Sequence, residues 1–213
     1  MTVLIGMFDS PFVRRVAVSL DALGLPFEHR NWSVGKDFDR IREFNPLGRV
    51  PTLVLDSGEA LIESSMILDH LDRAAGSERA LLPPHGEMRS AALRVMALAT
   101  GAVDKALLIV MERVFRPAEK FHEPFVARCR LQLQGALAAI EDLCVARGDA
   151  PWLAGEAMTQ ADITFACFLT YVREAVPFDL SAYPSLLVRL DRYQALPLFA
   201  RYHVPFDAPV PTT

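Results

Sequence analysis

The sequence predicts two domains, a small α/β domain with the order βαβ-α-ββα followed by an all-helical bundle. Residues 2–76 alternate short apolar runs with helical patterns, whereas every long segment from about residue 87 has helical spacing. Between them, residues 77–86 contain two adjacent prolines and no periodicity, which is typical of a linker. The length of 213 residues agrees with this division, since one domain typically has about 150. We therefore expect domains at residues 1–76 and 87–213, joined by a linker at 77–86.

The composition is that of a folded, acidic protein. Of the 213 residues, 52% are apolar or aromatic, and the net charge of -4 is too small for a disordered chain. Acidic residues outnumber basic ones by 26 to 22 without any basic run, so we expect no nucleic-acid partner. No uncharged run exceeds about ten residues, whereas a membrane span needs about 20. Because the N-terminus also lacks a basic signal-peptide region, we expect a cytoplasmic protein without a membrane span.

Three cysteines, Cys129, Cys144 and Cys167, have neither metal-ligand nor redox spacing. An odd number of cysteines does not pair completely within one chain. We expect each to pack as a small hydrophobic residue in a reducing compartment, and we expect no metal site.

The first domain begins with a pattern typical of a βαβ unit. Residues 3–8 are apolar throughout, which predicts a buried strand. Ser10 and Pro11 then supply an N-cap and a proline at the first helical position, and Gly24 ends the predicted helix. Residues 27–32 predict the second strand, so the unit spans about thirty residues.

A helix, a hairpin and a last helix complete this domain. The hairpin is predicted because two short apolar runs flank the turn sequence DSGE. The expected ranges are 38–44 for the short helix, 45–48 for a turn, 52–62 for the hairpin and 64–76 for the last helix.

The second domain is predicted to contain two long helices and a buried central one. Residues 87–116 and 123–147 are long enough for helices of about 45 Å and 37 Å. Residues 159–176 are almost entirely apolar, so we expect this helix in the middle of the bundle. A further helix is expected at 183–194.

Ser10 stands where a strand ends and a helix begins. The free N–H groups and partial positive charge of a helix N-terminus favour an anion. A bound thiol would ionise more easily there, and a serine hydroxyl would donate a charge-assisted hydrogen bond to the thiolate. The alternative is that Ser10 only caps its helix.

Two further motifs have both a binding and a structural interpretation. A cis Pro51 would leave the backbone of Val50 free to pair with an extended peptide, whereas a trans proline would only begin an edge strand. Glu63 and Ser64, at the start of a helix, would suit the ammonium and carboxylate groups of an amino acid, or would form a local cap. Together with Ser10, these motifs describe a short peptide with a thiol, a free amino-acid end and a carboxylate. That ligand is glutathione.

At these residues the chain resembles the cytosolic glutathione transferase family over nearly its whole length. The active-site start of the serine-type classes, closest to tau-like and related bacterial members, is similar to SPFVRRV at 10–16. The glutathione-binding signature is similar to NPLGRVPTL at 45–53 followed by LIESSMI at 61–67. The capping segment of the helical domain is similar to WLAG at 152–155 with TQADI at 159–163.

The resemblance implies a thioredoxin-like first domain and a role for each motif residue. Ser10 would be catalytic, stabilising the glutathione thiolate. Val50 would pair with the cysteinyl backbone ahead of a cis Pro51. Glu63 and Ser64 would hold the γ-glutamyl end.

Other contacts are implied by their place in the family pattern. Lys36, with Arg49 as a second contact, would meet the glycine carboxylate, and Thr159 with Asp162 would be a structural cap. The second substrate would lie between the domains. The nearest residues for that pocket are Phe12, Arg113 and Phe115.

The implied function is an enzyme that transfers glutathione to a small, hydrophobic electrophile, typically as a detoxifying homodimer. Three alternatives stay open. The chain could be a non-catalytic interaction module, or a glutathione-dependent isomerase or dehalogenase with the same residues. Thiol–disulfide chemistry is the third, although related classes use a cysteine where this chain has Ser10. The sequence leaves the identity of the second substrate open.

Overall fold

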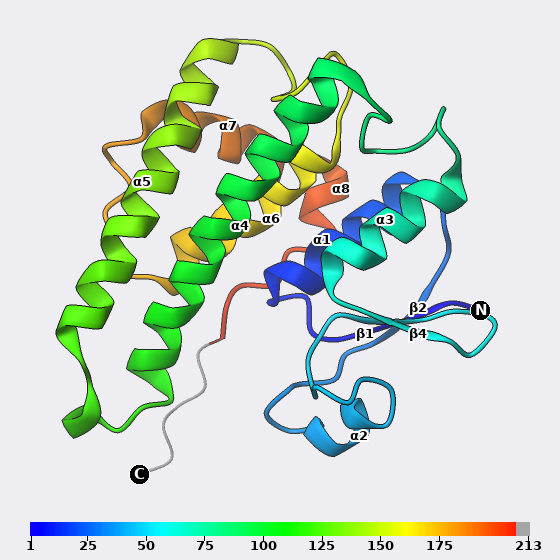
Figure 1. The fold of residues 1–213 in the computed structure, drawn as a ribbon, viewed down its shortest axis with the longest axis horizontal. Helices are drawn as coiled ribbons and strands as arrows, with labels where there is room; N and C mark the ends of the chain where they lie inside the picture. The colour runs from blue at the N-terminus through cyan, green and yellow to red at the C-terminus, as the bar shows by residue number, and fades with distance from the viewer. Residues whose placement is uncertain (208–213) are drawn as a thin grey trace.

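The computed structural model describes residues 1–207 and has the predicted two-domain architecture (Figure 1). In the first domain four strands form one mixed sheet in the order β2-β1-β3-β4. β1 pairs parallel with β2 and antiparallel with β3, and β3 pairs antiparallel with β4. The strands are β1 Val3–Ile5, β2 Glu28–Arg30, β3 Thr52–Val54 and β4 Ala60–Ile62. The predicted fold class, a thioredoxin-like domain followed by an all-helical domain, is thereby confirmed.

Three helices cover the two faces of this sheet. α1 (Pro11–Ala22) and α3 (Ser64–Ala75) lie on one face and the short α2 (Phe38–Arg42) on the other (Figure 1). Successive side chains of a strand point to opposite faces. Leu4 of β1 accordingly joins the main core with α1 and α3, while its neighbours Val3 and Ile5 form a smaller cluster with Ile41 of α2.

The first two strands are shorter than the predicted ranges 3–8 and 27–32. β1 stops at Ile5 because Gly6 has a φ of 132°, a conformation that a side chain would rarely adopt. β2 stops at Arg30 because the chain turns there, with the Trp32 N–H donating to the Arg30 carbonyl at 2.8 Å. The apolar run at 3–8 continues past β1, so periodicity alone places the end of that strand too late, whereas residues 27–32 are mostly polar and carry no signal for the ends of β2.

The second domain contains the expected helices, with ends within one or two residues of the predictions. The long helices α4 and α5 lie side by side and form the outer wall of the domain (Figure 1). The helices of this domain are α4 Gly86–Val114, α5 Glu123–Arg147, α6 Gln160–Ala175, α7 Pro184–Gln194 and α8 Pro197–Ala200.

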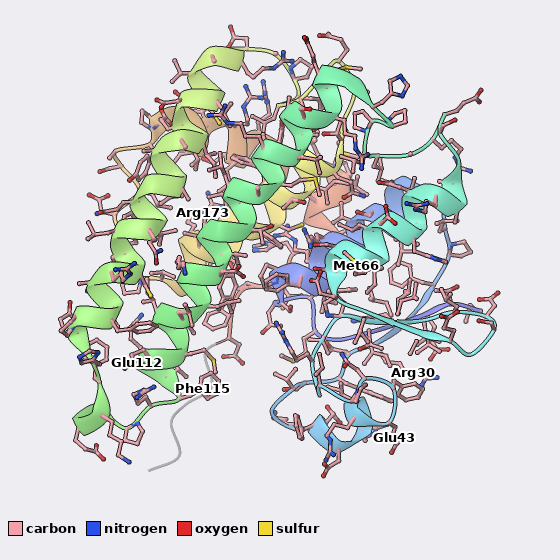
Figure 2. All side chains as sticks on the ribbon, viewed as in Figure 1. Arg30, Glu43, Met66, Glu112, Phe115 and Arg173 are labelled. Atoms are coloured by element: carbon pink, nitrogen blue, oxygen red, sulfur yellow. The ribbon has the colours of Figure 1, made fainter. Side chains whose placement is uncertain are left out.

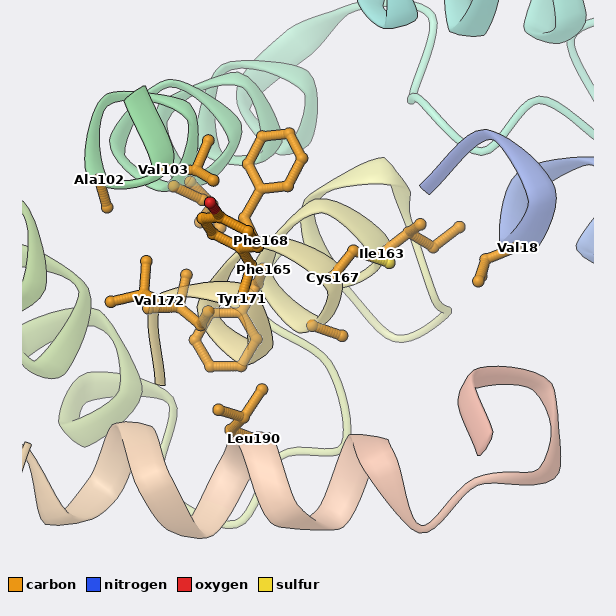
Figure 3. Packing of buried hydrophobic residues seen from close by; sticks show 14 of the residues in the cluster. Val18, Ala102, Val103, Ile163, Phe165, Cys167, Phe168, Tyr171, Val172 and Leu190 are labelled. Carbon is orange, nitrogen blue, oxygen red and sulfur yellow. The ribbon is translucent and has the colours of Figure 1, made fainter. Parts of the chain in front are cut away.

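α6 is the central helix of the bundle, as its apolar sequence predicts. Every residue from Gln160 to Val172 is buried. Its side chains pack between α4, α1 and α7, represented in Figure 3 by Val103, Val18 and Leu190. The three cysteines are free and buried, which agrees with their expected role as small core residues.

The segment between α3 and α4 is fastened to α3. The Asp72 carboxylate accepts hydrogen bonds from the N–H groups of Leu81 at 2.8 Å and Leu82 at 3.1 Å. The assignment of 77–86 as an interdomain linker stays a prediction. Within residues 1–207, no helix combines the length and apolarity that crossing a bilayer requires.

Candidate functional site

One pocket of the first domain collects most of the residues that the motifs single out. Its wall includes both members of the Val50–Pro51 pair and both members of the Glu63–Ser64 pair, together with Arg49 from the loop before β3. The other lining residues are Phe12, Asn45, Leu47 and Ile62. Motifs separated by up to 50 positions in the chain therefore share one concave surface.

Ser10 is the N-cap of α1. The Val13 N–H donates to Ser10 Oγ at 3.5 Å, a distance at the outer limit for a hydrogen bond. Pro11 occupies the first helical position, where its missing N–H costs nothing. Within residues 1–207, the hydroxyl hydrogen of Ser10 has no protein acceptor. The side chain thus caps the helix weakly and keeps its own proton for another acceptor.

The Val50–Pro51 peptide bond is cis. In the part of the chain that the structure describes, neither the N–H nor the carbonyl of Val50 takes part in a backbone hydrogen bond. Val50 lines the same pocket as Glu63. Gly6 lies directly beneath Val50, because a Cβ at position 6 would approach Val50 Cβ to 2.8 Å.

The loop that carries Val50 is held by Asn45, a residue that the motif analysis did not single out. Asn45 is buried, and its Nδ2 donates to the Arg49 carbonyl at 2.7 Å and to Thr52 Oγ1 at 3.2 Å. Its Oδ1 accepts from the Leu47 N–H at 3.0 Å. The sequence signal was present as the Asn-Pro turn, but turn residues predict a bend rather than the partners of their side chains.

Glu63 has an unusual backbone conformation at the start of α3. Its φ of 68° is the one positive value at a non-glycine residue within 1–207. Such conformations are uncommon and cluster at functional sites. The Glu63 carboxylate accepts from the Ser65 N–H at 3.0 Å and from the Ser64 hydroxyl at 3.2 Å. Both interpretations of this motif are therefore compatible with the structure, since Glu63 caps α3 and also lines the pocket.

A buried arginine stands behind these two serines. Arg15 Nη2 donates to Ser64 Oγ at 2.6 Å and to Ser65 Oγ at 2.8 Å. The guanidinium also lies 4.7 Å from the ring centroid of Phe168 on α6, so it joins the two domains. Burial lowers the pKa of Arg15 to about 10, and the negative charge of Glu63 opposes this shift. Arg15 therefore places positive charge directly beneath the serine hydroxyls.

Helical spacing does not reveal Arg15. The predicted buried face of α1 contains Val13, Val16, Ala17 and Leu20, and Arg15 lies on the opposite face. In the structure α1 is buried on both faces, because it packs on the sheet and also against α6. A long charged side chain in a helix usually reaches solvent, and nothing in the local sequence shows that a second domain covers it.

The two cations proposed for the glycine carboxylate are placed differently. Arg49 is exposed and lines the pocket. Lys36 is exposed in the turn before α2 and does not line the pocket. Within residues 1–207, the Lys36 side chain makes neither a hydrogen bond nor an ion pair. The structure therefore brings Arg49, but not Lys36, together with the pocket residues.

One face of α4 is directed towards the first domain. Leu108, Met111 and Phe115 are 38%, 51% and 59% exposed, and their spacing places them on one side of the helix. Asp104 lies one turn earlier on that side; burial raises its pKa, and the charges of Lys105 and Arg49 oppose the rise. The charge of Arg49 acts on Asp104, and Arg49 lines the pocket, so this face of α4 lies near the pocket.

Phe115 and Arg113 do not share this face. At about 100° per residue, two positions separate them by about 200° around the helix. Figure 2 labels Phe115 and Glu112 at the same end of α4, where the Glu112 carboxylate accepts the His122 N–H at 3.0 Å. Phe12 is the third residue proposed for the second substrate. Its ring centroid lies 4.9 Å from that of Phe168, and it also lines the pocket that contains Val50 and Glu63.

Thr159 and Asp162 form a capping box at the start of α6. Asp162 is fully buried and accepts hydrogen bonds from the Thr159 N–H at 2.9 Å and the Thr159 hydroxyl at 3.0 Å. It also accepts from the Leu153 N–H at 2.8 Å and the Tyr193 hydroxyl at 2.7 Å. One carboxylate therefore links the segment before α6, the start of α6, and α7. No group of three His, Cys, Asp or Glu side chains within residues 1–207 has a geometry that could hold a metal ion.

A thioredoxin-like domain with a cis-proline loop, joined to an all-helical domain, is the fold of the glutathione transferases. The family model described as "Glutathione S-transferase, N-terminal domain" matches residues 4–79, and the model described as "Glutathione S-transferase, C-terminal domain" matches residues 123–203. The chain belongs to the glutathione S-transferase family.

Known relatives agree with this assignment. The GST-like protein YibF of Escherichia coli, which is itself uncharacterized, is 30% identical over 95% of this chain and 98% of its own length. A glutathione S-transferase of Methylobacterium radiotolerans, solved with glutathione sulfonate, is 32% identical with a TM-score of 0.85 over 100% of this chain and 96% of that one. A family member from Pseudomonas fluorescens with bound glutathione is 29% identical with a TM-score of 0.83, over 97% of this chain and 100% of that one.

Proposed function

We propose that this protein is a glutathione transferase, which ionises the thiol of glutathione and transfers the thiolate to a small, hydrophobic electrophile. The observation that carries the proposal is the pocket that joins the free backbone of Val50 to Glu63 and Ser64. Similar proteins have been solved with glutathione or glutathione sulfonate bound, which supports the same ligand here.

In this proposal the pocket residues bind glutathione together with Ser10 and Arg15, which are not among the residues that line the pocket. The Ser10 hydroxyl donates a hydrogen bond to the thiolate at the N-terminus of α1. Val50 pairs with the cysteinyl backbone, and Pro51 directs that segment outward. Glu63 and Ser64 bind the γ-glutamyl end, where Arg15 adds positive charge beneath the carboxylate. Arg49 meets the glycine carboxylate, and Lys36 is a second cation that would have to reach this carboxylate from outside the pocket.

We further propose that the protein is a serine-type member close to the tau-like and bacterial classes. A relative named probable glutathione S-transferase GSTU1 from Oryza sativa subsp. japonica is 35% identical over 82 residues, 38% of this chain. Residues 1–76 would be the glutathione-binding domain and 87–213 the helical domain, with a cytoplasmic location and a role in detoxification. The buried, unpaired state of all three cysteines speaks against thiol–disulfide chemistry.

The second substrate would lie between Phe12 and the exposed face of α4 that carries Phe115. Leu108 and Met111 extend that apolar face and were absent from the motif analysis. Arg113 lies about 200° around α4 from Phe115, so on this arrangement its side chain would start from the side of the helix that faces away from the substrate. The protein would act as a homodimer, which light scattering would test. The 63% exposed Met66 on α3 supports an interface, because large exposed apolar side chains often mark one.

Calorimetric titration with glutathione tests the binding half of the proposal. We expect a saturable signal with a dissociation constant in the micromolar to millimolar range, about -4 to -8 kcal/mol. A chain that binds no glutathione at millimolar concentration would instead be an interaction module. If glutathione binds, a panel of electrophiles and halogenated or isomerisable substrates separates conjugation from dehalogenation and isomerisation.

A positioning role for Arg15 leads to a second expected result. Replacing Arg15 by methionine should raise the dissociation constant of glutathione about tenfold or more, because a hydrogen bond to a charged group contributes about 1.5–3 kcal/mol. Arg15→Lys should recover part of that affinity by keeping the charge. Titration calorimetry of the folded variants measures both.

The neighbouring Arg14 supplies a matched control. It is also buried, but its bonds go to Gln194 and to the Phe199 carbonyl in the helical domain. Arg14→Met should therefore lower stability without weakening glutathione binding comparably. Equal losses of affinity in both variants would show that Arg15 acts only through general stability.

A further inference from the structure

A carboxylate with one buried oxygen that has no hydrogen-bond partner among the described residues directly precedes Ser10 in the chain. Asp9 ends the loop from β1 and immediately precedes the N-cap of α1. Its Oδ1 atom is buried and has no hydrogen-bond partner within residues 1–207. In that part of the chain Asp9 forms no ion pair either. Asp9 lies outside the sequence motifs and has no role in the proposed function.

The groups that face Asp9 from other elements do not neutralise its charge. They are Tyr171 on α6 and Asp207 in the segment after α8. Burial raises the pKa of Asp9, the N–H groups of Ser10 and Asp9 oppose the rise, and the charge of Asp207 adds to it. Asp9 in turn adds to the raised pKa of Tyr171, which burial mainly causes.

We propose that Asp9 is a second determinant of the reactivity of the glutathione thiol bound beside Ser10, because its negative charge opposes ionisation of the thiol and leaves the thiolate more basic. This inference rests on the proposed function, in which the thiol binds at the N-terminus of α1. Both anions are stabilised by the same helix N-terminus. A like charge at short range favours the protonated form of its neighbour.

Asp9 carries its charge when the thiol titrates. A carboxyl group ordinarily titrates more than four units below a thiol. Burial narrows this gap at Asp9, but the N–H groups of Ser10 and Asp9 favour the ionised form. The charge therefore acts through space on the thiol proton, which leaves to solvent without passing through Asp9.

The charge of Asp9 lowers the ionised fraction of the thiol and raises the nucleophilicity of the thiolate that forms. Removing the charge would increase the ionised fraction at neutral pH. The resulting thiolate would be a weaker nucleophile, because the nucleophilicity of thiolates falls with their basicity with a Brønsted slope of about 0.4–0.5. Asp9 thus favours a more reactive thiolate over a more abundant one.

The test compares wild-type protein with Asp9→Asn, a variant of the same shape without the charge. In the glutathione complex, ultraviolet absorbance of the thiolate should show a thiol pKa lower by about half a unit to one unit. The pH profiles of turnover should then cross. Below the thiol pKa the variant should be about two- to threefold faster, and on the alkaline plateau about two- to threefold slower, given the Brønsted slope.

Two further variants separate charge from structure. Asp9→Glu keeps the charge and should keep the thiol pKa close to that of the wild type. Asp142→Asn removes the same charge from an exposed position of α5 and should change neither the pKa nor the profile.

Three results would overturn the inference. An unchanged or raised thiol pKa in Asp9→Asn would show that Asp9 does not act on the thiol. A uniform loss of turnover at every pH would show a structural role. A wild-type protein that binds glutathione without forming any thiolate would remove the proposed function itself, and this inference with it.

Discussion

Replacing Ser10 by alanine should lower turnover with a reactive chloronitroaromatic electrophile about 10- to 100-fold. The Ser10 hydroxyl has a free proton at the N-terminus of α1, and a hydrogen bond to a charged acceptor contributes about 1.5–3 kcal/mol. Binding of glutathione should weaken much less, by about threefold at most, because the other proposed contacts remain. Steady-state kinetics and calorimetry measure the two quantities, and the thiolate absorbance of the complex should fall in parallel with turnover.

The control for this prediction is Ser10→Thr, which keeps a hydroxyl and an N-cap. It should retain far more turnover than the alanine variant. Undiminished turnover in Ser10→Ala would leave Ser10 as a helix cap and nothing more. An equal loss of binding and turnover would show that Ser10 contributes to affinity rather than to ionisation of the thiol.

Replacing Asp162 by alanine should cause the largest loss of stability, about 3–5 kcal/mol. The substitution leaves four buried donors, on Leu153, Thr159 and Tyr193, without their acceptor. Breaking a buried network of this kind is among the few mechanisms that destabilise so strongly. For a chain of this length the midpoint of thermal unfolding should fall by about 10 °C, which calorimetry or circular dichroism measures.

Thr159→Ala separates the network from the cap alone. It removes one member of the capping box and should cost about 1 kcal/mol. If Asp162→Ala lost no more than Thr159→Ala, the bonds of Asp162 to Leu153 and Tyr193 would contribute nothing to stability. The interpretation of Asp162 as a link between the segment before α6 and α7 would then be wrong.

The fold was predictable because its signals are local. Ser10 with Pro11 marks the start of α1, and the apolar run after Thr159 marks the central helix α6. Helix ends carry caps and breakers, so they were placed closely. Strand ends carry no such signal, and the turn at Trp32 ends β2 earlier than the predicted range 27–32.

The site residues that belong to one sequence motif could be predicted. Those that enter the site only because distant segments pack together could not. Glu63 and Ser64 belong to one motif, and the structure places both in the pocket. Arg15 bonds to residues about 50 positions away, and the exposed face of α4 acquires a meaning only when the two domains are placed together. The spacing of residues along one helix does not show how the two domains pack against each other.

Because Arg15 contacts both domains, a substitution in one domain should restrict which substitutions the other domain can accept. One guanidinium holds Ser64 and Ser65 of the first domain and lies against Phe168 of the second. A change at position 168 can therefore reach the glutathione site without touching it. Relatives that exchange domains or drift in α6 should be able to do so only with a compensating change at position 15, so that these positions covary across the family.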